Sequence, residues 1–270
     1  MSDNLVKIPD YLPKDSNLGH GKHLVTTAKC INVLLIGRSG VGKRTFVNTL
    51  VDPQIGTSTR DTLTNTENPQ ISTLILKDND TGLSYQINII DTPGLDEKHL
   101  DNKNGADEQL MSLATECVRR NITWLNVVCM VTKAGTTEQS DVNVFKLLTE
   151  ALGERYSKIA MMIVTHCDEY TETVCESFID FIKTDKSTKP YYDYCRLGTY
   201  MFGAIDCKKV GAVPENVVRH YVAAKLERIE IMRQDIIAKI VACSDTKLDV
   251  EEFKCIYDKI HQDQNDNIKQ

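Results

Sequence analysis

The sequence lacks the signals that send a chain into or across a membrane. Its apolar runs fall short of the roughly 18 residues that suggest a membrane span, and its start, MSDNLVKIPDYLPKDS, has no apolar stretch typical of a signal peptide. Ser2 stands where N-myristoylation needs glycine, and the last residues, DNIKQ, form no prenylation motif. We therefore expect a cytoplasmic protein whose contact with membranes is at most indirect.

Cross-linking and metal-binding motifs are missing as well. The nine cysteines are odd in number and contain no CxxC pair, which favours reduced thiols over a disulfide framework. The six histidines form no HExxH motif and no Cys/His cluster, so we expect no structural zinc site. A formal net charge of −6 leaves no overall positive charge for a nucleic-acid partner.

What the sequence does contain is an alternation of strand-like and helix-like runs. Some strand-like runs are almost continuously apolar, as in a parallel sheet covered by helices on both faces. Two others alternate in polarity around the turn signal DNDTG, which predicts an antiparallel pair. The order predicts an α/β fold with a mostly parallel sheet of about six strands. The strand-like runs are 31–36, 71–77, 85–91, 125–132, 158–165 and 198–203, and the helix-like runs are 43–52, 105–121, 139–152 and 171–184.

Composition divides the chain into four segments. We expect a polar leader at 1–30, the α/β domain at 31–213, a helical extension at 214–262 and a disordered tail at 263–270. The extension carries an apolar stripe on a helix of about 28 residues. Such a stripe commonly packs on its own domain, and a dimer or partner surface is the alternative. The stripe consists of Val218, Val222, Ile229, Met232, Ile236 and Ile240.

The first strand-like run leads into GRSGVGKR (37–44), which matches the phosphate-binding pattern GxxxxGK[ST] everywhere except at its last position. Its glycines let backbone N–H groups wrap phosphates, and the helix that begins at Lys43 adds the partial positive charge of its N-terminus. The Lys43 ammonium reaches the β- and γ-phosphates of a nucleotide. The expected phosphate-binding residues are Gly37, Arg38, Ser39, Gly40, Val41, Gly42, Lys43, Arg44 and Thr45.

Arg44 stands where a Ser or Thr hydroxyl ordinarily ligates Mg²⁺, which a guanidinium cannot do. Thr45 follows about 100° further around the helix and should not replace that hydroxyl. Arg44 either points outward, leaving Mg²⁺ weakly held by waters and phosphate oxygens, or places its guanidinium where the cation would lie. Both interpretations predict weakened Mg²⁺ dependence and slow hydrolysis.

Two further segments are expected to sense the γ-phosphate and the metal. DTPGL (91–95) ends a strand, where Asp91 can hold Mg²⁺ through a water and the Gly94 N–H can meet the γ-phosphate. The long loop 53–69 should supply a sensing hydroxyl that also ligates the metal. Among its threonines at 57, 59, 62, 64 and 66, we favour Thr64.

The run VTHCDEY (164–170) is expected to recognise the base. Asp168 can accept two hydrogen bonds from the N1–H and 2-amino groups of guanine, a donor pair that adenine does not present. Thr165 and His166 make this motif TxxD, and His166 either lies against the base or is a solvated loop residue. Gly203 and Ala204 of YMFGAID should contact the base through their backbone.

Together these motifs resemble the AIG-type GTPases, septin-related P-loop GTPases that include the GIMAP family and, slightly further off, the chloroplast outer-envelope import receptors. The resemblance covers about residues 31–210 and rests on LLIGRSGVGK, INIIDTPGL, VTHCD and the segment 125–166. That segment is similar to the hydrophobic box of this family, which consists of an apolar strand, a T-x-E/D stretch, a helix and GE before the next strand.

The resemblance implies a guanine-nucleotide-binding domain at 31–213 that uses GTP or GDP with Mg²⁺ and pairs face to face across its nucleotide sites. It also implies a GTP-controlled scaffold acting on an effector protein that the sequence does not identify. Some members of the family donate an arginine across the dimer. Arg119 and Arg120 are the candidates here, and solvated helix-end arginines are the more usual interpretation.

The chain departs from the family pattern at three places. Arg44 replaces the usual Ser, Gly203 and Ala204 replace a polar pair behind the base, and Leu95 follows DTPG where no Gln orients a water. The first hypothesis is a GTP/GDP switch that dimerises with GTP and hydrolyses it slowly. The second is a non-hydrolysing, GTP-bound assembly scaffold, and a P-loop kinase or ATPase is the third.

Overall fold

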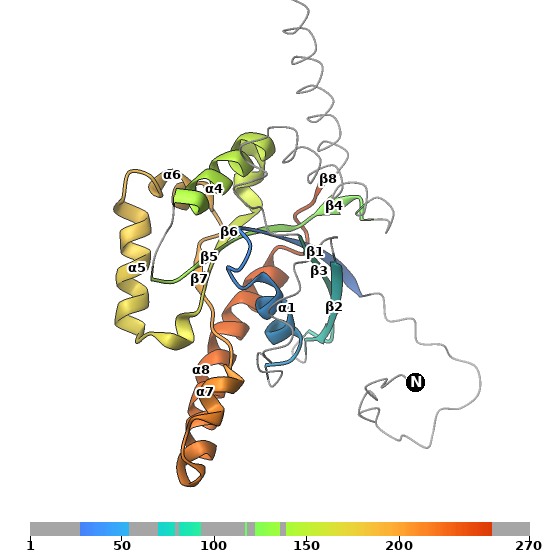
Figure 1. Ribbon diagram of the computed structural model, residues 1–270. Helices are drawn as coiled ribbons and strands as arrows, with labels where there is room; N and C mark the ends of the chain where they lie inside the picture. The colour runs from blue at the N-terminus through green and yellow to red at the C-terminus, as the bar shows by residue number, and fades with distance from the viewer. Residues whose placement is uncertain are drawn as a thin grey trace, which may run out of the picture.

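The computed structural model describes residues 28–53, 70–78, 81–92, 117, 122–135 and 139–249. At their centre is a six-stranded sheet with the strand order β2-β3-β1-β5-β6-β7 (Figure 1). Its strands are β1 (Lys29–Ile36), β2 (Gln70–Lys77), β3 (Ser84–Asp91), β5 (Val127–Lys133), β6 (Ala160–Thr165) and β7 (Thr199–Met201).

Five of the six strands of this sheet run parallel, and β2 pairs with β3 in the antiparallel sense. This confirms the predicted mostly parallel sheet and its one antiparallel pair. Because β3, β1, β5 and β6 run parallel, their carboxyl ends meet at one edge of the sheet. Ligands of open α/β sheets bind outside that edge.

Helices cover both faces of the sheet, as predicted, because alternate side chains of each buried strand point to opposite faces. Leu34 and Ile36 of β1 face the cluster covered by α4, α5 and α6. Val33 and Leu35 face the opposite cluster, which is covered by α1 and α8 (Figure 1). The helices are α1 (Lys43–Val51), α4 (Gln139–Leu152), α5 (Glu172–Thr184), α6 (Lys189–Tyr194), α7 (Cys207–Gly211) and α8 (Glu215–Ala242).

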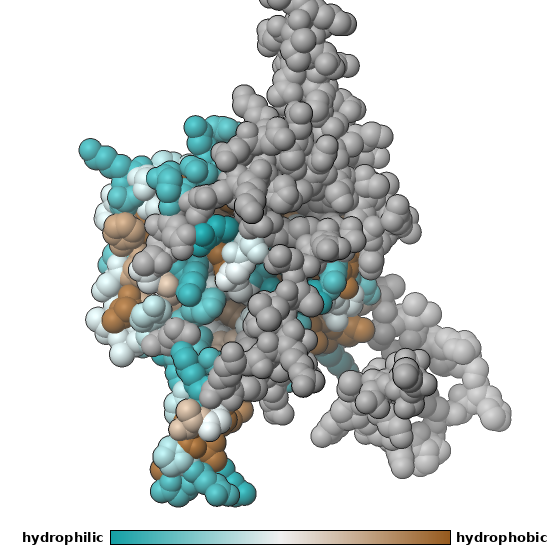
Figure 2. Space-filling view, viewed as in Figure 1, coloured by the Kyte–Doolittle hydropathy of each residue, from teal (hydrophilic) through white to brown (hydrophobic). Residues whose placement is uncertain are grey.

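The long helix α8 has two differently packed halves. Its second half carries Ile236 and Ile240, which are 0% and 1% exposed and belong to the core cluster against the sheet. Its first half projects from the body (Figure 1) and mixes hydrophobic with hydrophilic residues at its surface (Figure 2); Val217 there is 44% exposed. The predicted apolar stripe is therefore buried in its second half and only partly covered at Val218 and Val222.

A buried amide fastens the end of α8 to the sheet. Asn126 lies between β4 (Trp124–Leu125) and β5 and is 0% exposed. Its Oδ1 accepts from the backbone N–H of Asn32 at 2.9 Å. Its Nδ2 lies 2.7 Å from the carbonyl oxygen of Thr246 and 3.3 Å from those of Cys243 and Ser244. The chain after α8 can then pair as β8 (Leu248–Asp249) with β4.

Some predictions concern residues outside the described part of the chain. The helix-like run 105–121 is described only at Cys117, which is helical and buried. The leader, most of loop 53–69, and the chain from 250 onward also lie outside it, so the segment boundaries remain predictions. None of the helices within the described residues is long and apolar enough to cross a bilayer.

Replacing Asn126 with Ala should destabilise the fold by about 2–3 kcal/mol, because buried backbone groups of Asn32 and of the chain after α8 would lose their partner. Urea unfolding followed by circular dichroism measures this change. Asn143→Ala, at an exposed position on α4, is the matched control and should stay within about 0.5 kcal/mol of the parent. Equal stability of the two variants would contradict this role of Asn126.

Candidate functional site

The phosphate loop lies at the carboxyl end of β1, where it turns directly into α1. Gly37 has no room for a side chain, since a Cβ there would lie 2.5 Å from the carbonyl oxygen of Val131. Gly42 caps α1 with a φ of 93°, a left-handed conformation that favours glycine. The first N–H groups of α1 thus face the same edge of the sheet as the loop, as phosphate binding requires.

Lys43 is the charged centre of the loop. Its ammonium donates to the carbonyl oxygens of Gly37 at 2.7 Å and of Arg38 at 3.0 Å, and the residue is only 7% exposed. The guanidinium of Arg38 lies 3.3 Å from the buried carboxylate of Asp141 on α4. The Lys43 ammonium is therefore hydrogen-bonded to the backbone of the loop, while the Arg38 guanidinium pairs with Asp141 on α4.

Arg44 turns toward the end of β3. Its Nη1 lies 3.6 Å from Oδ2 of Asp91 and also hydrogen-bonds to Oε1 of Gln70, the first residue of β2. Asp91 is 2% exposed, and neither of its carboxylate oxygens has a hydrogen-bond partner among the described residues. Burial raises the pKa of Asp91, and the charges of Lys43 and Arg44 partly offset that rise.

This geometry bears on how well the site suits a divalent cation. A buried carboxylate without hydrogen-bond partners suits Mg²⁺ or its water ligand. The Arg44 guanidinium, however, already approaches the same carboxylate. A cation at Asp91 would share its ligand with a second positive charge, so the described residues suit Mg²⁺ less well than a loop ending in Ser or Thr would.

Thr165 joins the TxxD segment to the phosphate loop. Its hydroxyl oxygen lies 2.6 Å from the carbonyl oxygen of Val41 and 3.0 Å from that of Thr132 at the end of β5. The hydroxyl also lies 3.0 Å from Nδ1 of His166, whose φ of 62° turns the chain sharply after β6. A side chain on Gly42 would come within 3.3 Å of the His166 ring. The ring therefore borders the phosphate loop, and Thr165 bonds to the loop backbone.

Asp168 belongs to the short 3-10 helix η3 (Cys167–Glu169), beside the chain that leaves β7. Its Oδ1 accepts from the backbone N–H of Ala204 at 3.2 Å. At Gly203 an added Cβ would lie 2.8 Å from the Cβ of Asp168, so only glycine allows this approach. The predicted base-binding residues Asp168, Gly203 and Ala204 are therefore brought together.

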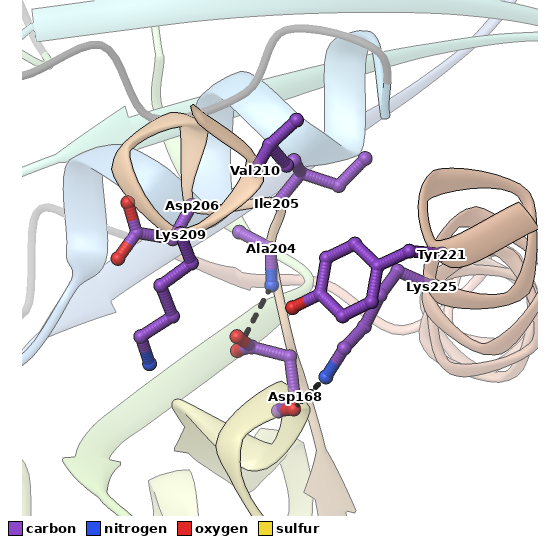
Figure 3. A pocket seen from close by; sticks show the side chains of 8 residues that line it. All are labelled: Asp168, Ala204, Ile205, Asp206, Lys209, Val210, Tyr221 and Lys225. Carbon is purple, nitrogen blue, oxygen red and sulfur yellow. Dashed lines mark hydrogen bonds between the residues drawn. The ribbon is translucent and has the colours of Figure 1, made fainter. Parts of the chain in front are cut away.

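A pocket of about 180 Å³ opens beside Asp168 (Figure 3). It is smaller than the roughly 300–1,000 Å³ of typical small-molecule sites, so it suits one part of a ligand, such as a single heterocycle. The sequence predicted only two of its residues, because the rest come from α7, the chain before it, and α8. The lining residues are Asp168, Ala204, Ile205, Asp206, Lys209, Val210, Tyr221 and Lys225.

Two basic side chains of α8 also hold the TxxD segment through its backbone. The Lys225 ammonium donates to the carbonyl oxygen of Asp168, and Arg228 Nη1 donates to that of Tyr170 at 2.7 Å. No sequence motif marks these residues, and their contacts depend on where α8 docks. Their spacing on one helical face was the only signal the sequence offered.

Several predicted residues lie outside the described part of the chain. These are the γ-phosphate and metal candidates Gly94 and Thr64 and the arginine candidates Arg119 and Arg120. Their roles, like the individual roles assigned to the phosphate-loop and base-binding residues, remain predictions.

Comparison with known proteins gives partial matches to a septin homolog, to a cell division control protein and to a chloroplast translocon component. Septin homolog spn1 of Schizosaccharomyces pombe is 41% identical over 69 residues, and cell division control protein 11 of Saccharomyces cerevisiae is 42% identical over 77. These matches cover 23% and 26% of this chain but only 15% and 18% of the two relatives.

Among solved structures, two crystal structures of Toc33 from Arabidopsis thaliana are similar to this chain. A dimerization-deficient mutant has a TM-score of 0.48 at 20% identity, and the complex with GDP and Mg²⁺ has 0.45 at 21%. Each match covers 65% of this chain and 71% of Toc33.

The family model described as the AIG1 family matches residues 31–191, which is more than half of the chain. The match includes the phosphate loop, the strand ending at Asp91 and the TxxD segment. The chain therefore belongs to the AIG1 family, and its α/β domain is a GTP-binding domain of the P-loop GTPase class.

Proposed function

We propose that this domain is a GTP/GDP switch that hydrolyses GTP slowly and dimerises through its nucleotide face in the GTP state. One observation carries the proposal: the Thr165 hydroxyl lies 2.6 Å from the Val41 carbonyl oxygen and so holds the Asp168 segment against the phosphate loop. A single nucleotide can then place its phosphates at Lys43 and its base at Asp168.

The phosphate end would be bound by groups that already converge. Phosphate oxygens of a nucleotide can replace the carbonyl oxygens of Gly37 and Arg38 as hydrogen-bond acceptors of the Lys43 ammonium. The N–H groups at the start of α1 add the positive end of the helix dipole. Both interactions favour a polyphosphate over a monophosphate, because they accept several negative oxygens at once.

At the metal position the Arg44 guanidinium would neutralise part of the phosphate charge. It lies beside Asp91, where Mg²⁺ would polarise the β- and γ-phosphates and stabilise the charge that develops during transfer. A guanidinium pairs well with phosphate oxygens but brings no bound water and no octahedral geometry. We therefore infer that binding depends weakly on Mg²⁺ and that hydrolysis is slow.

The rival function is a scaffold that binds guanine nucleotide, needs little Mg²⁺ and turns over negligibly. The pairing of Arg44 with Asp91 favours it, since this pairing weakens the one described metal ligand. The two functions differ in turnover, which a phosphate-release assay with the full chain measures. With either function, the protein would act in the cytoplasm on an effector protein. Light scattering with and without a GTP analogue tests whether the chain forms a homodimer in the GTP state.

Asp168→Asn should lower GDP affinity roughly 100-fold and raise affinity for xanthosine diphosphate. The physical reason is that an amide presents one donor and one acceptor, which match the O2 and N1–H of xanthine instead of the two donors of guanine. Calorimetric titration of the purified chain with both nucleotides tests this. Asp206→Asn, a carboxylate of the same pocket, is the control and should keep the preference for guanine. A switch caused by Asp206→Asn instead would refute the role of Asp168.

Arg44→Ser should make nucleotide binding depend on Mg²⁺. We expect chelation of Mg²⁺ to weaken binding of a non-hydrolysable GTP analogue less than about tenfold in the parent chain and roughly 100-fold in Arg44→Ser. Arg44→Ala separates loss of the guanidinium from gain of the hydroxyl, and should bind more weakly both with and without Mg²⁺. Identical Mg²⁺ dependence in the parent and Arg44→Ser would overturn this account of Arg44.

A further inference from the structure

The base pocket has a wall that lies outside the AIG1 match. Tyr221 and Lys225 belong to α8, beyond residue 191, where the family model ends. In Figure 3 both side chains extend from the helix toward Asp168, and the Tyr221 ring lies along the side of the pocket opposite Asp206 and Lys209. The pocket is thus closed by a helix about 50 residues downstream of Asp168 in the sequence.

The Tyr221 ring has no place in the hydrophobic core. It is half-buried, yet it belongs to neither of the two core clusters of the described residues. One ring contact is with its neighbour on the helix, the Lys225 ammonium, 5.8 Å from the ring centroid. An aromatic ring that lines a polar pocket without joining the core is suited to contact a planar heterocycle.

The first half of α8 contacts the domain at the Asp168 segment and at α7. Lys225 and Arg228 donate to the carbonyl oxygens of Asp168 and Tyr170. Toward its start the helix is mostly exposed, as at Val217. The two contacts from Lys225 and Arg228 therefore join the Asp168 segment to this half of the helix.

We propose that α8 completes the nucleotide site, with Tyr221 as a residue that contacts the base and Lys225 and Arg228 as residues that position the Asp168 segment. This inference rests on the proposed guanine-nucleotide function. It makes base binding and docking of the first half of α8 mutually stabilising, because each supplies contacts that the other needs. A partner that binds the exposed start of α8 would then change nucleotide affinity.

The test is a titration of the full chain with GDP and inosine diphosphate, which lacks the 2-amino group. Tyr221→Ala should weaken both nucleotides about tenfold, because contact between an aromatic ring and a base tolerates either base. Tyr221→Phe, which keeps the ring, should bind as the parent does. His220→Ala, exposed on the adjacent position of α8, is the matched control and should also leave both affinities unchanged.

A second measurement separates a positioning role from general loss of structure. In the parent chain, bound GDP should slow amide hydrogen exchange in residues 216–228. Lys225→Met should abolish that protection and lower the preference for GDP over inosine diphosphate. Lys225→Arg should restore the protection and the preference. Equal GDP affinities of Tyr221→Ala and His220→Ala, or no protection in the parent, would overturn the inference while the switch function stands. If the parent chain bound neither nucleotide, both the inference about α8 and the proposed switch function would be wrong.

Discussion

The contact between the Thr165 hydroxyl and the Val41 carbonyl oxygen is the constraint on which the site depends. It joins the end of β6 to the loop after β1, although β5 lies between these strands in the sheet. The same hydroxyl lies 3.0 Å from the Thr132 carbonyl oxygen, so all three strand ends are held together. Because Thr165 is 3% exposed, water does not compete for these contacts.

Charge at the phosphate end is arranged around one buried carboxylate. Burial makes ionised Asp91 costly and raises its pKa, and the cationic side chains of Lys43 and Arg44 counteract that rise. With Ser at position 44, no guanidinium would approach Asp91, and its carboxylate could bind a metal ion instead. An Arg supplies the positive charge from the chain itself, so the site carries its own counter-charge whether or not a metal is bound. This difference underlies the proposed weak dependence on Mg²⁺.

Helix α8 connects the core to the pocket beside Asp168. Near one end, the buried amide of Asn126 bonds the chain that follows the helix, and Ile236 and Ile240 pack under the sheet. In its first half, Lys225 and Arg228 donate hydrogen bonds to backbone carbonyl oxygens of the TxxD segment. One helix thus links a fully buried anchor to the partly exposed pocket beside Asp168, which is how the coupling we propose would be carried along it.

Local sequence patterns determined much of this protein. Buried strands are recognisable because both of their faces are apolar, and the phosphate loop because glycines must stand where a Cβ would clash, as Gly37 does against Val131. The antiparallel pairing of β2 with β3 followed from a turn signal between them. These features depend on residues close together in the sequence, so their physics can be predicted without the fold.

The tertiary structure decided what depends on distant segments. Three contacts show this: Arg44 turns toward Asp91, Thr165 bonds to the phosphate loop, and Tyr221 and Lys225 lie beside Asp168. In each of them the residues are between 47 and 124 positions apart in the sequence. Periodicity indicated that α8 has an apolar face, but not which part of it would be buried or which side chains would line the pocket beside Asp168. Those outcomes depend on how α8 packs against the sheet, because contacts between distant segments arise only when the whole core assembles.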